Sequence, residues 1–279
     1  MKPESRIIKP RERTEESGFN MVELLVVMTM VAILAATALS AFGKSKGNRG
    51  RGQCLNNCKQ LINGYRMYAQ DNDDYALGAW PSPNGVPAWC SGWLGGPPDA
   101  IDLRVITNSP TYPYIQSVDA FRCPDDESAF FFRGRLYPRN RSYSVNGFMG
   151  YPSAFVYPNC PPYKPVIKLG EVAGLGPSSI YVLIEEHANS LNDSHFLPFT
   201  DLKAFHGQRW LDAPTGRHHN SAAIAFADGH AKMHKWKDTD LTPERFGPNG
   251  LIIPNYALFL PGPGPRDFEW FAEHIAPRQ

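Results

Sequence analysis

The chain has 279 residues and a formal net charge of +1, from 28 basic and 27 acidic side chains. This balance gives no global positive field, which argues against a dedicated nucleic-acid-binding protein. The 26 prolines and 24 glycines stay below the share of about 25–30% that is typical of low-complexity chains. We therefore expect a folded domain with long irregular loops.

The N-terminal segment combines a glycine, an aromatic residue, an acid and an apolar run. Gly18 and Phe19 precede Glu23, and the 19 residues Leu24–Phe42 carry no charge. As a helix this run would reach about 28 Å, enough to cross a membrane. An acid at the mouth of such a span is costly unless a cation neutralises it. Cleavage after Gly18 would create that cation, because the new amino group of Phe19 would lie four residues before Glu23.

This block resembles the N-terminus of type IV pilins and type II secretion pseudopilins. The resemblance implies that prepilin peptidase cuts after Gly18, that Phe19 is methylated, and that Glu23 joins subunits during filament assembly. It implies the peptidase, other pilin-like subunits in a homo- or hetero-filament, and an inner-membrane assembly platform as partners. It also implies a single-pass inner-membrane protein whose C-terminal part lies on the periplasmic side.

Two other interpretations of the segment stay open. Ala36-Thr37-Ala38 is similar to the cleavage site of a secretory signal peptide, and the apolar run is also long enough for an unprocessed anchor. The run exceeds the usual apolar core of a signal peptide, about 7–15 residues. Neither alternative gives Glu23 a role, so the pilin-like interpretation is preferred.

A glycine-rich segment and a helix follow the apolar run. Residues 43–52 contain four glycines, each of which costs a helix about 1 kcal/mol relative to alanine, so we expect a flexible break. Apolar residues then recur at steps of three and four, which predicts a helix over 53–70 with one face packed on a sheet. The acids Asp71–Asp74 lack the glycine and glutamate of an EF-hand loop, so no calcium site is expected there.

Several strands are predicted after the helix. Short strands are expected around Ala120-Phe121 and over 142–145 and 180–184. Asp228-Gly229, the preferred residues of a type I′ turn, predict a hairpin over 221–236.

This two-residue turn sets the expected register. Ile224, Phe226 and Met233 would then face the helix, with His230 and His234 on the opposite face. The tail, 240–279, reads as irregular apart from an amphipathic piece near Phe268.

A second resemblance covers the region after the apolar run. His218, nine further residues and Asp228-Gly229 match the H-x9-DG segment of a pilin-like family associated with prepilin processing. Three other pieces look similar to that family: Cys54–Leu61, Phe121–Pro124 and Arg141–Gly147. The resemblance implies a disulfide between Cys54 and Cys123 and a membrane subunit without a known reaction.

The candidate chemical sites have simple structural explanations. Turn formation accounts for Asp228 and Gly229, and a backbone hydrogen bond accounts for His218. A metal site needs three or four ligands to converge, and no H-E-x-x-H spacing is present. Histidines and acids that could supply ligands are frequent after residue 184: Glu185, Glu186, His187, Asp193, His195, His206, His218, His219, His230 and His234. If a site exists, His230 and His234 are the favoured candidates. We expect no cofactor, with calcium or zinc as the alternatives, and no enzyme, because phosphate-binding loops and nucleophile elbows are absent from the sequence.

Together these observations predict an α+β pilin-like fold: a long N-terminal transmembrane helix packed on an antiparallel sheet with long loops. The expected parts are a removed leader (1–18), a transmembrane and assembly helix (19–42), a flexible segment (43–52) and a globular head (53–279). The expected function is a structural subunit of a type II secretion or type IV pilus-like assembly. The alternatives are a membrane-tethered extracytoplasmic metal-binding or hydrolytic protein, and a minor pilin that binds glycans or surfaces.

Overall fold

The computed structural model describes residues 20–151, 163–176, 178, 180–199, 209–241 and 262–278, and within the first helix it does not describe the side chains of 35–49. The chain divides into two compact units, an N-terminal unit (1–46) and a C-terminal unit (47–279). The two units are considered separately below.

Helix α1 runs from Met21 to Asp71. It is helical through the glycine-rich segment 43–52, so the expected break there is wrong. The cost of each glycine is small enough for neighbouring contacts to offset. Gly50 illustrates one such contact, because a Cβ at this position would lie 2.1 Å from the carboxylate oxygens of Asp125. The missing side chain lets Asp125 approach the helix backbone.

The expected membrane span is not found. In the part of the chain that the structure describes, no helix combines the length and the apolar character needed to cross a bilayer. This finding contradicts the expected transmembrane helix and the expected inner-membrane location.

The C-terminal unit is built on a five-stranded sheet with the order β5-β3-β4-β6-β7. Its strands are β3 (Tyr143–Asn146), β4 (Tyr181–Glu185), β5 (His195–Phe196), β6 (Ser221–Phe226) and β7 (Ala231–Lys235). Strand β5 runs parallel to β3, so the sheet is mixed, and the expected antiparallel sheet is wrong in this respect. Strand β4 runs antiparallel to β3 and so brings the chain back to the end of the sheet where β3 begins, from which β5 can run parallel to β3.

The remaining elements are short. A separate hairpin is formed by β1 (Ala129–Phe132) and β2 (Arg135–Pro138). The helices are η1 (Asp99–Ile101), α2 (Arg104–Thr107), α3 (Tyr112–Ile115), η2 (Asp119–Phe121), η3 (Leu169–Leu175) and α4 (Pro265–His274). The strand expected at Ala120-Phe121 is therefore wrong, because two apolar residues alone do not distinguish a strand from a helical turn.

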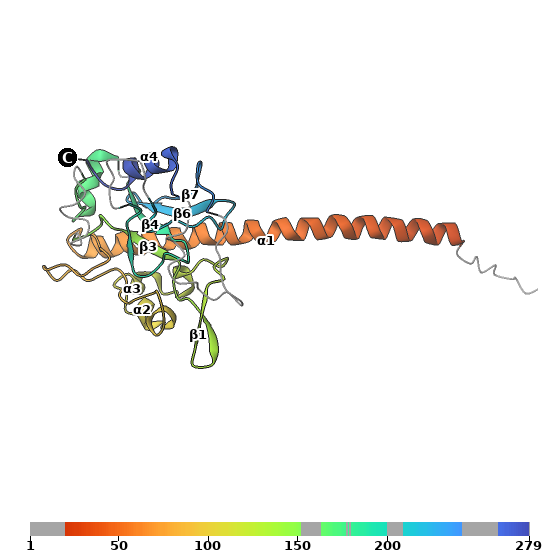
Figure 1. Cartoon of the computed structure of the whole chain (residues 1–279), viewed down its shortest axis with the longest axis horizontal. Helices are drawn as coiled ribbons and strands as arrows, with labels where there is room; N and C mark the ends of the chain where they lie inside the picture. Colours follow the sequence, from red (N-terminus) through yellow and green to blue (C-terminus); the bar gives the residue numbers. More distant parts are fainter. Residues whose placement is uncertain are drawn as a thin grey trace, which may run out of the picture. The chain divides into compact units, whose positions relative to one another are not determined.

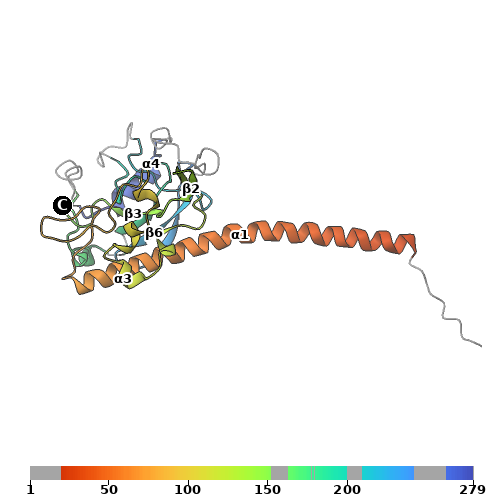
Figure 2. The same ribbon diagram turned by 90° about the horizontal axis from the view of Figure 1, so that it is seen from below.

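Within the C-terminal unit, α1 and α4 lie on opposite faces of the sheet (Figures 1 and 2). On the face toward α1, strand β6 carries the small side chains of Ala223 and Ala225, which pack in one cluster with Leu61. Larger side chains of the neighbouring strands, Tyr143, Val145 and Leu183, belong to the same cluster. The other face of β6 carries Ile224 and Phe226, which pack with aromatic residues of α4.

The β6–β7 hairpin differs from the expected register by one residue. Ala223 lies opposite Met233, and Ile224 lies opposite Lys232. The loop is not a two-residue type I′ turn, because Gly229 donates to the Phe226 carbonyl and takes a φ of 94°. A slip of one residue exchanges the two faces of a strand. Met233 therefore shares a face with Ala223 and packs toward α1 as predicted, whereas the prediction that Ile224 and Phe226 also meet α1 is wrong, because both pack in the cluster with α4.

The tail is not wholly irregular as expected, because α4 (Pro265–His274) forms there. Phe268 and Phe271 of this helix are buried in the aromatic cluster under the sheet. The carboxylate of Asp267 accepts hydrogen bonds from the backbone of Lys237, Asp238 and Thr239, at 2.7–3.0 Å. Tertiary contacts thus stabilise a ten-residue helix that is too short to be stable in isolation.

Candidate functional sites

The first described turns of α1 expose a long apolar surface. All eleven large apolar side chains between Met21 and Leu34 are exposed, from 44% at Val26 to 83% at Met21. They include Leu24, Leu25, Val27, Met28, Met30, Val31 and Ile33, which point to every side of the helix. An apolar surface of this extent on a folded chain marks an interaction site.

Glu23 takes part in a capping box at the start of α1. The side-chain oxygen of Asn20 accepts a hydrogen bond from the Val22 amide at 3.3 Å, and the Glu23 carboxylate accepts one from the Asn20 amide at 3.1 Å. This reciprocal arrangement satisfies donors that a helix N-terminus otherwise leaves unpaired. Glu23 therefore has a local structural role that the sequence analysis did not consider.

A second site is a buried cluster of four potential metal ligands, Cys54, Cys123, Glu185 and His218. Cys54 lies on α1 and Cys123 follows η2. Glu185 ends β4, and His218 lies in the turn before β6. Cys54, Cys123 and Glu185 are fully buried, and His218 is 2% exposed. One potential ligand atom from each residue lies within 4.8 Å of all the others.

The closest contacts connect all four side chains. The Cys54 Sγ lies 3.1 Å from the Glu185 Oε2. The His218 Nε2 lies 3.3 Å from the Cys123 Sγ and 3.5 Å from the same Glu185 oxygen. Glu185 and His218 are therefore central to the cluster, with one cysteine beside each.

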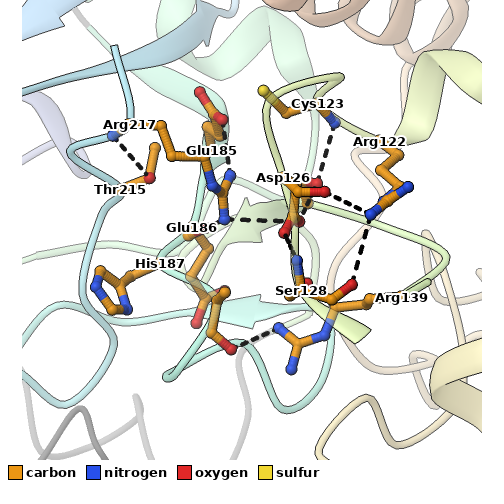
Figure 3. Close-up of polar contacts among 12 residues, drawn as sticks. Arg122, Cys123, Asp126, Ser128, Arg139, Glu185, Glu186, His187, Thr215 and Arg217 are labelled. Carbon is orange, nitrogen blue, oxygen red and sulfur yellow. Dashed lines mark hydrogen bonds and ion pairs between the residues drawn. The ribbon is translucent and has the colours of Figure 1, made fainter. Parts of the chain in front are cut away.

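Charged and polar side chains lie beside the cluster, and Figure 3 shows those near two of its members, Cys123 and Glu185. Arg217 lies between two buried carboxylates, 2.8 Å from Glu185 and 3.5 Å from Asp126. Asp125 lies 3.4 Å from the His218 Nδ1, on the far side of the ring from the cluster. The Tyr143 hydroxyl contacts the Cys54 Sγ at 2.9 Å. These neighbours hold the ligand side chains in position.

Burial and neighbouring groups shift the pKa values of Glu185, His218 and Cys54. Burial alone would raise the pKa of Glu185, but the hydrogen bond from His218 and the charge of Arg217 hold it at about 2. Burial alone would lower the pKa of His218, but contacts with Cys123 and Glu185 raise it to about 10. Burial, the contact with Cys123 and the charge of Glu185 raise the pKa of Cys54. At neutral pH and without metal, the cluster holds a charged Glu185–His218 pair and a protonated Cys54.

The predicted disulfide is not formed. Cys54 and Cys123 are close together but both are free thiols, as are the buried Cys58 and Cys90. The predicted cleavage site, Gly18 and Phe19, lies outside the described residues.

The structure separates His218 from the rest of its motif. Asp228 and Gly229 form the β6–β7 turn as expected, with the Asp228 carboxylate accepting from the His230 amide at 3.0 Å. His218 instead joins the buried cluster, where its ring contacts side chains rather than backbone. The structural role predicted for Asp228 and Gly229 therefore has a direct explanation in the turn.

The metal candidates His230 and His234 do not form a cluster of ligands in the described residues. The His230 ring bonds Asp228 at 2.6 Å and stacks on Phe226. The His234 ring packs on Trp270, with the ring centres 4.2 Å apart. Aromatic packing explains both positions.

A comparison of the chain with protein-family models, curated proteins and solved structures finds no match. The functional argument therefore depends on the two sites themselves. The sequence favoured a disulfide for Cys54 and Cys123 and a turn for His218, although Glu185 and His218 also belong to the group of histidines and acids from which a metal site could be drawn. One feature of the sequence could have indicated that these four residues lie together in the interior: Cys54 is on the apolar stripe of the helix predicted at 53–70, where a side chain is expected to be buried.

Proposed function

We propose that this protein is a structural subunit that associates with copies of itself through the exposed apolar surface of α1, residues 21–34. The observation that carries the proposal is the exposure of all eleven large apolar side chains in this stretch. Burying them against similar surfaces would remove a large apolar area from water, at about 25 cal/mol per Å². The stretch contains one charged residue, Glu23, so little opposes such burial.

The distribution of apolar residues favours several neighbours over a single partner. A two-stranded coiled coil needs only a narrow seam, about two apolar positions in seven. Here the large apolar side chains occupy eleven of fourteen positions. A helix that is apolar all round is stable when it is covered on all sides, which a bundle or filament of copies supplies. Cleavage after Gly18 belongs to the same proposal, because it would place the Phe19 amino group beside Glu23 of the same or a neighbouring chain.

The test compares two matched double variants of the full chain. Val27→Asn with Val31→Asn alters the apolar surface of α1, while Phe131→Asn with Leu136→Asn alters exposed apolar residues of the β1–β2 hairpin. Sedimentation velocity and negative-stain electron microscopy would measure assembly over a range of concentrations. We expect large assemblies from the wild type and the hairpin variant, and smaller species from the α1 variant. A wild type that stays monomeric, or an α1 variant that assembles normally, would contradict the proposal.

A further inference from the structure

We propose that Cys54, Cys123, Glu185 and His218 form a four-coordinate zinc site that ties α1 to the sheet of the C-terminal unit. The four ligands come from four separate segments of the chain, spread over 164 residues from Cys54 to His218. Two thiols, an imidazole and a carboxylate are all established zinc ligands. This site does not depend on the proposed assembly, because all four side chains belong to one C-terminal unit.

Three of the six distances between ligand atoms fit a tetrahedral ion, and the other three are no longer than 4.8 Å. Zinc binds sulfur at about 2.3 Å and nitrogen or oxygen at about 2.0–2.2 Å, so its ligand atoms lie about 3.4–3.8 Å apart. The three contacts within the cluster measure 3.1 Å for Cys54 to Glu185, 3.3 Å for Cys123 to His218, and 3.5 Å for His218 to Glu185. All three fall within about 0.5 Å of the tetrahedral spacing, so small side-chain movements would admit the ion.

The surrounding side chains are those that a zinc site requires. A histidine that binds metal through one ring nitrogen usually directs the other to a carboxylate. His218 does this, because its Nδ1 lies 3.4 Å from Asp125 while its Nε2 faces the cluster. Arg217 bonds the Glu185 oxygen that does not face Cys54, at 2.8 Å. The contacts with Asp125 and Arg217 orient the side chains of His218 and Glu185, and each leaves one ligand atom directed toward the cluster.

The charges also fit. Two thiolates and one carboxylate carry three negative charges, and a divalent ion leaves one uncompensated. The Arg217 side chain, 5% exposed, lies between Glu185 and the buried Asp126, and Arg139 adds a second positive charge near Asp126. The two guanidinium groups together match the remaining charge of the site and that of Asp126. Buried charge is tolerated when it is paired and hydrogen-bonded, which this arrangement achieves.

The chemical type of the ligands indicates which metal binds, and their burial indicates whether the metal is structural or catalytic. Calcium and magnesium prefer ligand sets made of oxygen, whereas two sulfurs and one nitrogen suit zinc. The four protein ligands complete a tetrahedron and none is more than 2% exposed. A catalytic zinc keeps a position open for water. The site is therefore structural, and zinc would stabilise the fold where α1, the loop after η2, β4 and the turn before β6 meet.

The first test measures metal in the full-length wild-type chain. We expect one zinc per chain by plasma mass spectrometry, and absorption spectra of a tetrahedral, sulfur-ligated site after exchange with cobalt. X-ray absorption at the zinc edge should show two sulfur and two nitrogen or oxygen neighbours. A chain that stays free of metal after zinc is added, or native protein with a Cys54–Cys123 disulfide, would overturn the proposal.

Variants identify the ligands. Cys54→Ser and Glu185→Gln should each weaken zinc binding at least about tenfold, and Asp125→Asn should weaken it by about 10–100-fold through the His218 ring. Cys90→Ser is the matched control, since Cys90 is buried but lies outside the cluster. If a ligand variant fails to fold, the Asp125→Asn affinity and the X-ray absorption of the wild type still decide the question. Equal zinc loss in Cys90→Ser and Cys54→Ser would contradict the assignment.

Discussion

Two stretches of α1 are rich in apolar residues but differ in what covers them. In residues 21–34 every large apolar side chain is at least 44% exposed. In residues 54–69 the apolar residues recur at helical spacing, and Cys54, Leu61 and Tyr65 are fully buried against the sheet. A helix with one apolar stripe is covered by its own chain, whereas a helix that is apolar all round needs neighbours. The pattern of apolar residues, more than their number, separates the internal contact surface from the proposed external one.

The largest change in folding stability is expected at the buried ion pairs that Arg217 forms beside the covered stretch of α1. Arg217→Met should destabilise the fold by about 3–5 kcal/mol, because it removes the guanidinium that the buried Glu185 and Asp126 share. Urea unfolding would measure the change. Arg104→Met is the control, since the Arg104 side chain is 82% exposed in its pair with Asp102. Similar unfolding curves for the two variants would show that the buried network contributes little.

The same substitution in both stretches tests the comparison directly. Leu61→Ala should cost about 2–5 kcal/mol in unfolding free energy, because it opens a cavity between α1 and the sheet. Leu25→Ala should change the unfolding free energy of the monomer by less than about 0.5 kcal/mol, since Leu25 is 65% exposed. It should weaken assembly instead. Equal costs in the monomer would contradict the difference between the two stretches.

Two substitutions of Glu23 distinguish its role in helix capping from a role in charge pairing between chains. Glu23→Gln can keep the capping box, whereas Glu23→Ala loses it at a cost of about 1 kcal/mol to the start of α1. If the Phe19 amino group of a neighbour pairs with Glu23, both variants should fail to assemble in sedimentation velocity. Normal assembly of the glutamine variant would limit Glu23 to capping. Mass spectrometry of the mature N-terminus would show whether Phe19 is the first residue.

A smaller effect is expected from pH at His234. Burial, together with the positive charges of Lys232, His274 and Lys237, lowers the pKa of His234 to about 4 in the folded chain. The unfolded chain titrates near 6.5, so it binds more protons between pH 6.5 and 4, and folding stability falls as the pH falls through this window. His234→Phe retains a ring against Trp270 and should make the stability less dependent on pH there. Unfolding curves at pH 5 and pH 8 would test this, and an unchanged pH dependence would contradict it.

Local patterns predicted several elements closely. The strand expected over 180–184 is β4 (Tyr181–Glu185), and the hairpin expected over 221–236 contains β6 (Ser221–Phe226) and β7 (Ala231–Lys235). The signals are alternation, β-branched residues and Asp-Gly, all of which act over a few residues. The register was wrong because it depends on loop geometry. Asp228 bonds the His230 amide and Gly229 takes a positive φ, which adds a residue to the loop.

The sequence by itself determined the apolar start of α1, the stripe over 54–69 and the turn at Asp228, since each follows from neighbouring residues. Only the tertiary structure decided that Cys54, Cys123, Glu185 and His218 meet, and that alanines rather than Ile224 and Phe226 face α1. The physical reason is the distance along the chain over which each kind of interaction acts. Backbone preferences and periodicity act over a few residues, whereas contacts across more than a hundred residues depend on how the whole set of helices and strands packs.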